Sequence, residues 1–211
     1  MLLFISCDNK KSIENNYLSK KESAIANIGF SDVTIDAGLE NFIHDNGSFG
    51  KMWFPEQMGS GGGFIDYNND GWLDILLIGG GAWKDYTNRD VQTLWLYKNN
   101  ANGTFSEVTA ETGLEGINTY GLGVAAADYD NDGDQDIFLT TLDRNILLNN
   151  NEGSFVNVSK NAGLGNTLGW SSSAVFFDAD NDGWLDLYVG NYAIWSPLSD
   201  LWCSLDSKTK V

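Results

Sequence analysis

Asp66-Tyr67-Asn68-Asn69-Asp70-Gly71-Trp72-Leu73-Asp74 is the first of three copies of one pattern, and residues 128–136 and 178–186 are the other two. Each copy has oxygen-bearing side chains at positions one, three, five and nine, Gly at position six, and an apolar run directly after it. Hard cations such as Ca²⁺ take about six to eight oxygen ligands, and a D-x-[DN]-x-D-G start wraps alternate side chains around one ion. The Gly permits the sharp turn that this requires.

The pattern predicts about three Ca²⁺ ions, one in each Asp-rich loop. The candidate ligands stand at positions one, three, five, seven and nine: Asp66, Asn68, Asp70, Trp72 and Asp74; Asp128, Asp130, Asp132, Asp134 and Asp136; and Asp178, Asp180, Asp182, Trp184 and Asp186. Asn68 stands where the other loops have Asp, so we expect the first site to be the weakest. The alternative is that Asn-Asp-Gly only forms a tight turn, but crowded carboxylates repel one another unless a cation lies among them.

The loops differ from an EF-hand. That motif needs a Glu at position twelve and a helix on each side, whereas position twelve here is Leu77, Leu139 or Val189. Runs rich in β-branched and aromatic residues flank the loops, as at residues 174–177 and 137–140, and such runs favour strands. We therefore predict that each loop joins the two strands of a β-hairpin.

Two further phrases recur between the loops. One alternates Phe, Val and polar residues and closes on Gly-Leu, at residues 30–39, 105–114 and 155–164, and the other ends in Asn-Asn, at residues 94–100 and 146–150. Alternation predicts half-buried strands, so each unit reads as four strands. The loops start 62 residues apart and then 50 residues apart, which places an insertion around residues 80–92.

Four-stranded repeats of about 40 to 50 residues are typical of a β-propeller, in which about four to eight blades close a ring. We predict an all-β fold of four-stranded antiparallel blades at about residues 59–116, 121–166 and 169–211, after an outer strand at residues 28–34. This makes a partial propeller of about two and a half blades within residues 27–211. We expect the chain to be the N-terminal part of a longer protein, with an open edge on its third blade.

Three phrases carry a family resemblance: Gly-x-Gly-x-Ala-x-x-Asp-Tyr-Asp-Asn-Asp-Gly at residues 121–133, the Phe-x-x-Val-[Thr/Ser] phrase and the Gly-Leu phrase. With them, the sequence resembles the FG-GAP/VCBS repeats of integrin-α-like propellers. More narrowly, it resembles bacterial proteins related to cartilage acidic protein 1, which usually end in an ASPIC/UnbV module; no such segment is present here. The resemblance covers about residues 30–211. It implies calcium binding by the three loops, a propeller of about seven blades, and a short-loop disulfide from Cys203 to a Cys further along the chain.

The chain is strongly acidic. Its formal net charge is −17, and 12 of its 29 acidic residues lie in the three loops, so that three Ca²⁺ ions would bring the charge to −11. A surface for nucleic-acid phosphates needs clustered Lys and Arg, so we expect no nucleic-acid partner. No apolar run approaches the about 18 residues of a membrane span.

Residues 1–26 read as the remnant of an export signal followed by a linker. Leu3-Phe4-Ile5-Ser6-Cys7 resembles a bacterial lipobox, which predicts an exported protein of the cell envelope or surface, either anchored by lipid on Cys7 or secreted. The basic region and most of the apolar region of a signal peptide are missing ahead of Cys7. An ordinary terminus is therefore the alternative.

No catalytic motif stands out. The single His, His44, lies beside Asp45, which is typical of a solvated pair, and Gly59-Ser60-Gly61-Gly62-Gly63 lacks the Lys-Ser/Thr of a phosphate-binding loop. We expect these glycines to enter the first inner strand, where close packing excludes side chains.

The leading hypothesis is a non-catalytic, calcium-stabilised extracellular module for recognition of a protein or glycan or for adhesion, with candidate contact regions at residues 42–58 and 80–92. The alternative is part of a cell-envelope enzyme acting on polysaccharide. Five aromatic residues are candidates either for stacking on sugar rings or for packing between blades: Trp83, Tyr86, Trp170, Trp195 and Trp202.

Overall fold

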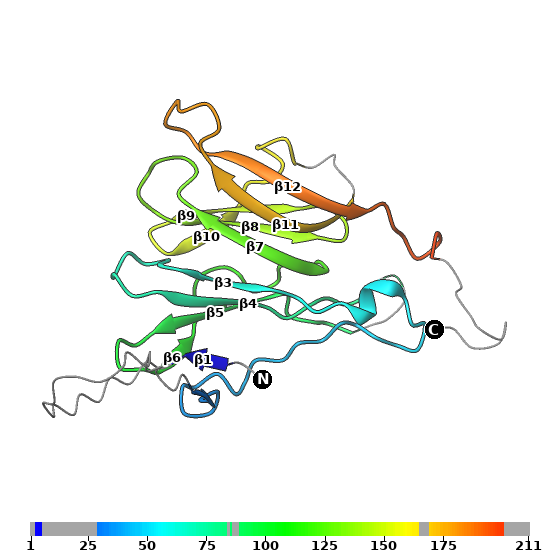
Figure 1. Cartoon of the computed structure of the whole chain (residues 1–211), viewed down its shortest axis with the longest axis horizontal. Helices are drawn as coiled ribbons and strands as arrows, with labels where there is room; N and C mark the ends of the chain where they lie inside the picture. Colours follow the sequence, from blue (N-terminus) through cyan, green and yellow to red (C-terminus); the bar gives the residue numbers. More distant parts are fainter. Residues whose placement is uncertain (1–2, 6–28, 84, 86–88, 165–168, 201–211) are drawn as a thin grey trace, which may run out of the picture.

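Three antiparallel sheets lie side by side, each containing one Asp-rich loop (Figure 1). The computed structural model describes residues 3–5, 29–83, 85, 89–164 and 169–200. The first sheet has the order β3 (Gly62–Ile65), β4 (Asp74–Ile78), β5 (Leu94–Asn99) and β6 (Phe105–Glu107). The second has the order β7 (Gly121–Ala127), β8 (Asp136–Thr141), β9 (Ile146–Asn151) and β10 (Ser154–Asn157). The third pairs β11 (Trp170–Phe177) with β12 (Asp186–Ala193).

This architecture confirms the predicted all-β fold of four-stranded antiparallel blades, present here as part of a propeller. The helical element of the described residues is one turn of 3-10 helix, η1 (Phe54–Gln57). None of the described residues belongs to a helix long and apolar enough to cross a membrane.

The first strands of the three sheets lie next to one another, because β7 contacts both β3 and β11. Glycine allows this close approach. The Gly61 amide donates to the Leu122 carbonyl across the sheets at 2.7 Å, and a Cβ on Gly123 would lie 2.9 Å from the Ser172 carbonyl oxygen. Within β3, a Cβ on Gly62 would lie 2.8 Å from the Leu76 carbonyl oxygen, so the Gly-rich stretch enters an inner strand as expected.

The main core fills the space between the first two sheets. Leu76, Leu96, Ile137 and Leu139 are among its fully buried members. Alternating residues of the same strands supply these side chains, as the two-residue period of a strand requires. Burial of this apolar surface on facing sheets is what ties neighbouring blades together.

The Gly-Leu phrases form turns that cap the next blade. The Phe105 amide donates to the Ala37 carbonyl at 2.8 Å, and the Phe155 amide donates to the Thr112 carbonyl at 2.8 Å. Residues 33–39 therefore contact the first blade in the same way as residues 108–114 contact the second. The repeat of the phrase in the sequence is also a repeat of its packing.

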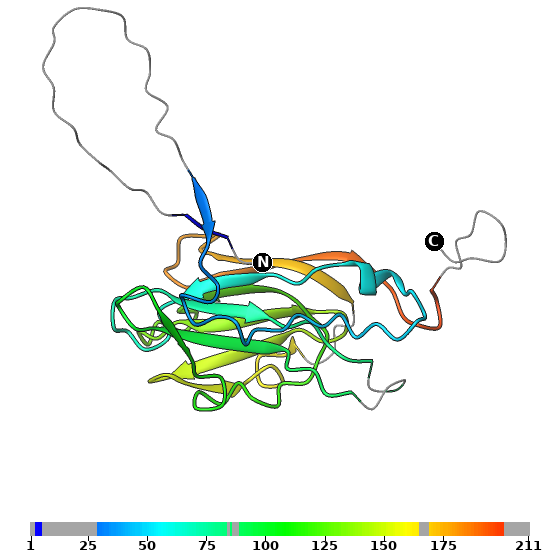
Figure 2. The same ribbon diagram turned by 90° about the horizontal axis from the view of Figure 1, so that it is seen from below.

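The N-terminal strands differ from the sequence prediction. β2 (Phe30–Asp32) pairs with β1 (Leu3–Ile5). The sequence predicts that β2 is part of an outer blade strand and that residues 3–5 belong to a signal remnant. The two strands lie to one side of the stacked sheets (Figure 2). A short strand with an open edge pairs with an available extended segment, and Leu3–Ile5 satisfies the backbone groups of β2.

Candidate metal sites in the Asp-rich loops

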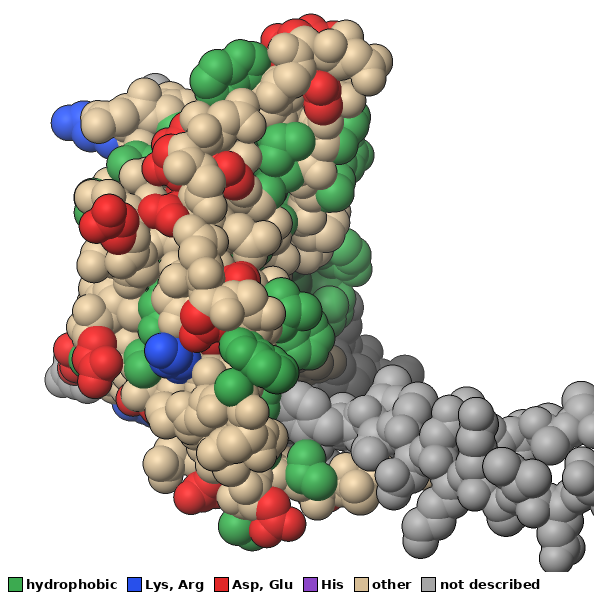
Figure 3. Space-filling model, turned by 90° about the vertical axis from the view of Figure 1, so that its left-hand side faces the viewer, with side chains coloured by type: hydrophobic (Ala, Val, Ile, Leu, Met, Phe, Trp, Pro, Cys, Tyr) green, Lys and Arg blue, Asp and Glu red, His purple; other side chains and the backbone are tan. Residues whose placement is uncertain are grey.

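All three Asp-rich loops connect the strands of β-hairpins, as predicted. In each, the residue before the loop pairs with the Asp at position nine: Ile65 with Asp74, Ala127 with Asp136, and Phe177 with Asp186. The loops therefore lie at the same end of the three sheets, on the left in Figure 1. Figure 3 views this end and shows Asp and Glu side chains gathered along it.

Each loop curls around the carboxylate at position one. The Oδ1 and Oδ2 atoms of Asp128 accept hydrogen bonds from the amides of Asp132 at 3.1 Å and Gly133 at 3.0 Å. The same pair of bonds forms in the first and third loops. Asn131 and Gly133 have φ of 58° and 97°, in the left-handed region where Gly and Asn are most easily accommodated.

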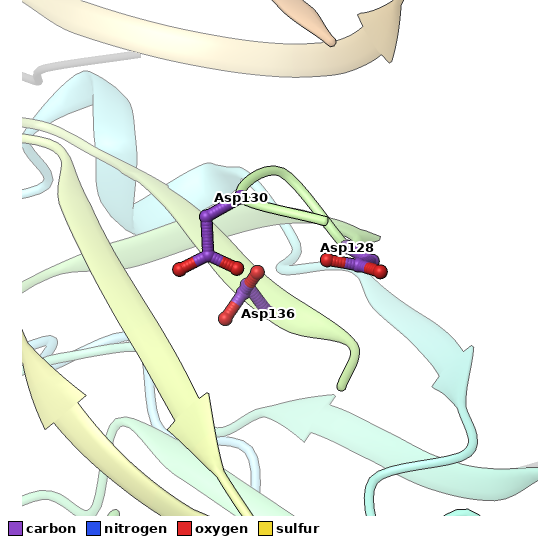
Figure 4. Close-up of side chains that lie close together, drawn as sticks. All are labelled: Asp128, Asp130 and Asp136. Carbon is purple, nitrogen blue, oxygen red and sulfur yellow. The ribbon is translucent and has the colours of Figure 1, made fainter. Parts of the chain in front are cut away.

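The second loop brings three carboxylates together (Figure 4). Asp128, Asp130 and Asp136 each present one oxygen, and these oxygens lie within 4.8 Å of one another. Asp136 is fully buried and accepts hydrogen bonds from the amides of Asn150 at 2.7 Å and Tyr129 at 3.1 Å. The carboxylates converge where solvent access is limited.

This crowding changes the titration of the carboxyl groups. Burial raises the pKa of Asp136 to about 6, although hydrogen bonds from Asn150 and Tyr129 oppose the change, and the neighbouring Asp130 and Asp132 carboxylates raise it further. Burial and then the charge of Asp132 also raise the pKa of Asp130. A cation in the loop would oppose both effects, because a nearby positive charge favours the ionised carboxylates and lowers their pKa values.

The donor set of the second loop fits a hard cation. The Oδ1 atom of Asp130 is buried and has no hydrogen-bond partner among the described residues. Buried polar atoms are normally satisfied, so a carboxylate with an unused buried oxygen beside two other carboxylates is suited to an ion. All the side-chain donors are oxygen atoms, which suits Ca²⁺.

The third loop repeats this cluster, and the first does not. Asp178, Asp180 and Asp186 also present oxygens within 4.8 Å of one another. In the first loop, Asn68 replaces the central carboxylate, and its Nδ2 atom donates to Asp70 Oδ2 at 3.0 Å. Lys98 Nζ also lies 3.7 Å from Asp70 Oδ2.

Among the described residues, the candidate ligands at loop positions five and seven do not belong to the clusters of three carboxylates. Asp132 Oδ1 accepts the amide of Asp134 at 2.9 Å. The Asp134 carboxylate accepts hydrogen bonds from Asn69 Nδ2 and the Glu152 amide, both at 2.7 Å. Trp72 and Trp184 have exposed rings without an oxygen atom, so position seven of the first and third loops offers only a backbone carbonyl to an ion.

Several residues that support the loops were not predicted. Asn149 Nδ2 donates to Asp130 Oδ2 at 2.9 Å and Asp136 Oδ1 at 3.1 Å, and Gln135 Oε1 accepts the Asp66 amide of the neighbouring blade at 2.9 Å. The recurring Asn-Asn phrase was a signal for a support that the first two blades share, since the side chains of Asn99 and Asn150 donate to the carbonyls of Leu73 and Gln135, both at 3.0 Å. The Asn99 and Asn150 amides both donate to the position-nine Asp, at 2.7 Å in each case.

The two candidate contact regions lie together. Asp45 forms an isolated parallel bridge with Gly80, and Arg89 forms an ion pair with Asp45 and donates to the Ser48 carbonyl at 3.1 Å. The carboxylate of Asp45 is therefore engaged by Arg89, where the sequence had suggested a solvated pair with His44. The described residues of the ranges 42–58 and 80–92 thus meet at one surface.

Two of the five aromatic candidates for sugar stacking are buried instead. Trp83 and Trp170 are 8% and 2% exposed and pack with Trp53, Tyr120 and Leu122, because aromatic rings gain from mutual edge-to-face contact. Trp195 packs against this aromatic cluster and stays partly exposed. Tyr86 and Trp202 lie outside the described residues, as do Cys7 and Cys203.

A family model described as FG-GAP-like repeat matches residues 66–139 and 140–189. The two matched segments cover the second sheet, most of the first, and β11 with its Asp-rich loop and the first half of β12. A comparison with curated proteins finds no match for the chain.

Proposed function

Because the chain belongs to the FG-GAP-like repeat family, we propose that it is a calcium-binding, non-catalytic module that recognises a protein or a glycan. FG-GAP repeats are extracellular repeat modules for recognition, typical of extracellular or surface proteins. We further propose that the chain is the N-terminal part of a longer protein of the ASPIC/UnbV group. We also propose that it is exported, and that it is then either anchored by lipid on Cys7 or secreted.

One observation carries the calcium proposal: Asp130 Oδ1 is buried without a partner beside the carboxylates of Asp128 and Asp136. Three carboxylates so close together are costly unless a cation balances them. The loop lies between two strands and has no flanking helix that moves, so the proposed role of the ion is structural. It neutralises the loop and holds the hairpin in one conformation.

Chelation tests this role. We expect the Tm in Ca²⁺ to lie well above the Tm in EDTA, because ion binding to the folded state alone stabilises it by about 2.7 kcal/mol per site at 100 times the Kd. Asp130→Asn removes one ligand charge with little change of shape and should reduce the Ca²⁺-dependent rise. Asp36→Asn, at an exposed position outside the loops, is the control and should leave it unchanged. Identical melting curves in Ca²⁺ and EDTA would remove calcium from the proposal.

The non-catalytic part needs a separate assay. The repetition of the same Asp pattern in every unit favours a structural ion, since a catalytic carboxylate pair occurs once per site. We expect no release of reducing ends when the protein is incubated with polysaccharides in Ca²⁺. Turnover that is lost on chelation would instead support the cell-envelope enzyme.

A further inference from the structure

The end of the sheets opposite the Asp-rich loops carries two neighbouring hollows. They lie where β4, β8, β10 and β12 end and where β7 begins, at the right of Figure 1. Their volumes are about 330 and 500 Å³, and they share Asn118, Thr119 and Asp143 as lining residues. We call them together the two-part groove.

The first part of the groove is aromatic. Trp83, Tyr120 and Trp195 line it, with ring centroids 4.7 Å apart for Trp83 and Tyr120 and 5.6 Å apart for Trp83 and Trp195. Trp195 is the most exposed of the three. Its packing against buried rings holds an apolar surface in place beside polar side chains. This is the combination by which proteins bind the C–H face and the hydroxyl groups of a sugar ring.

The second part is basic in an otherwise acidic protein. The described residues include five Lys and Arg side chains, of which Arg89 and Lys98 are in ion pairs. Two of the other three, Arg144 and Lys160, both line this part of the groove. Neither forms an ion pair among the described residues. Their charges are therefore available to an anionic group of a ligand.

The backbone around these side chains is held in place. The Thr93 hydroxyl donates to the Thr119 carbonyl at 2.8 Å and accepts from the Thr119 amide at 3.3 Å. The Asp143 amide donates to the Thr141 hydroxyl at 3.1 Å, and the Asp143 carbonyl accepts from the Gly169 amide at 3.2 Å.

The side chains of Asn118, Thr119 and Asp143 make no hydrogen bond within the described part of the chain. A fixed backbone that presents unused polar side chains is organised for a ligand before binding.

We propose that the two-part groove binds an acidic oligosaccharide. A sugar ring lies in the aromatic part, Asn118 and Asp143 bind hydroxyl groups, and a carboxylate or sulfate of an adjoining sugar pairs with Arg144 and Lys160. This rests on the proposed recognition function and selects a glycan over a protein, since the groove combines aromatic, amide and basic groups within about the size of a short oligosaccharide.

The binding test uses the Ca²⁺-loaded protein and three tetrasaccharides of similar length: a glucuronate-containing one, a sulfated one and a neutral cello-oligosaccharide. We expect at least one acidic sugar to bind about tenfold more tightly than the neutral one in titration calorimetry, and the stronger of the two identifies carboxylate or sulfate as the anionic group. Equal binding of all three, or binding of none, would overturn the proposal.

Single variants locate the site. Arg144→Ala and Lys160→Ala should each weaken binding of the acidic sugar about three- to fivefold, whereas Lys51→Ala, an exposed cation outside the groove, should not change it. Trp195→Ala should weaken binding about tenfold, and Trp195→Phe should retain most of it. Unchanged affinity in the Arg144 and Lys160 variants would contradict the groove assignment.

Ca²⁺ titration of the same samples keeps the two proposals distinct. If the protein binds Ca²⁺ but no sugar, the groove proposal alone is contradicted. If the protein binds no Ca²⁺, the calcium part of the proposed function is contradicted.

Discussion

Lys98 distinguishes the first Asp-rich loop from the second at the level of a single residue. It precedes Asn99 as Asn149 precedes Asn150, so the two residues hold the same place in their blades. Lys98 brings a positive charge within 3.7 Å of Asp70, where Asn149 donates a neutral amide to Asp130 and Asp136. A fixed cation opposes the entry of a divalent ion.

Lys98→Asn is therefore expected to raise the Ca²⁺ affinity of the first loop about two- to tenfold. The measurement is calorimetry in a background where Asp130→Asn and Asp180→Asn disable the other two loops. Lys51→Asn in that background is the control. An unchanged or weaker affinity in the Lys98 variant would show that Asn68 alone limits the first site.

Asp136 gives the calcium-free protein a specific pH dependence. Burial raises its pKa to about 6 in the folded chain, above about 3.9 for an unfolded Asp. Folding thus favours the protonated form, and this contribution to stability is complete below the unfolded pKa and is lost as pH rises through 6.

We expect Asp136 to make the free energy of unfolding, measured in urea with EDTA, at most about 1 kcal/mol higher at pH 5 than at pH 7. The effect is limited because solvent near the loop screens part of it. The Asp136→Asn variant should lose this contribution and keep only that of other carboxyl groups such as Asp130, whose pKa burial also raises. Greater stability of the wild-type protein at pH 7 would contradict the prediction.

The structure brings together some of the candidate ligands that the sequence suggests and leaves others apart. Positions one, three and nine converge in the second and third loops because the hairpin pairing fixes position nine opposite the residue before the loop. Asp134 looked equivalent in the sequence, but its carboxylate accepts from Asn69 of the neighbouring blade. Contacts between blades join residues about 65 positions apart, and no local pattern encodes them.

At the level of the element, the Asn at position four connects each hairpin loop to the next. Asn69 Nδ2 donates to the Gly133 carbonyl at 3.2 Å, and Asn131 Nδ2 donates to the Gly183 carbonyl at 3.1 Å. Asn181 has the same left-handed backbone, with φ of 61° against 58° for Asn131. Its side chain donates to none of the described residues.

Comparison of Asn131→Ala with Asn181→Ala therefore isolates the bond between blades. Both variants place Ala at a positive φ, which costs about 1 kcal/mol, but only Asn131→Ala also breaks a hydrogen bond worth about 1 kcal/mol. We expect the Asn131 variant to be less stable than the Asn181 variant by about this second amount in denaturant unfolding. Equal losses would mean that the bond between loops contributes nothing to stability.

Strand periodicity predicted the hairpins because half-buried strands leave a two-residue pattern. It did not predict β1 or the role of residues 33–39. The Phe-Ser-Asp-Val-Thr phrase looks the same wherever it occurs, whereas its strand partner depends on which segment lies alongside. β6 pairs with β5 of its own blade, and β2 pairs with Leu3–Ile5.

At the level of the whole molecule, the third sheet presents the open surface. Three apolar side chains of β11 and β12 are exposed: Val175 at 52%, Phe177 at 45% and Tyr188 at 62%. By contrast, the equivalent strands of the second sheet, β7 and β8, are in contact with β11. Exposed apolar residues on a sheet face are typical of an interface. This face is therefore suited to a contact of the kind that buries the facing sides of the first two blades.

The two ends of the stacked sheets differ in how much their loops vary. The Asp-rich loops have the same nine-residue pattern in all three copies, whereas the connections at the other end vary in length. The insertion at residues 80–92 is one of these connections and supplies Trp83 to the groove. Such an insertion changes a binding surface without disturbing any loop. The sequence could place the insertion, because the repeat spacing reveals it. It could not assemble the groove, since Trp83, Asn118 and Arg144 come from three connections and Trp195 from the segment after β12, and only the stacking of the blades brings them together.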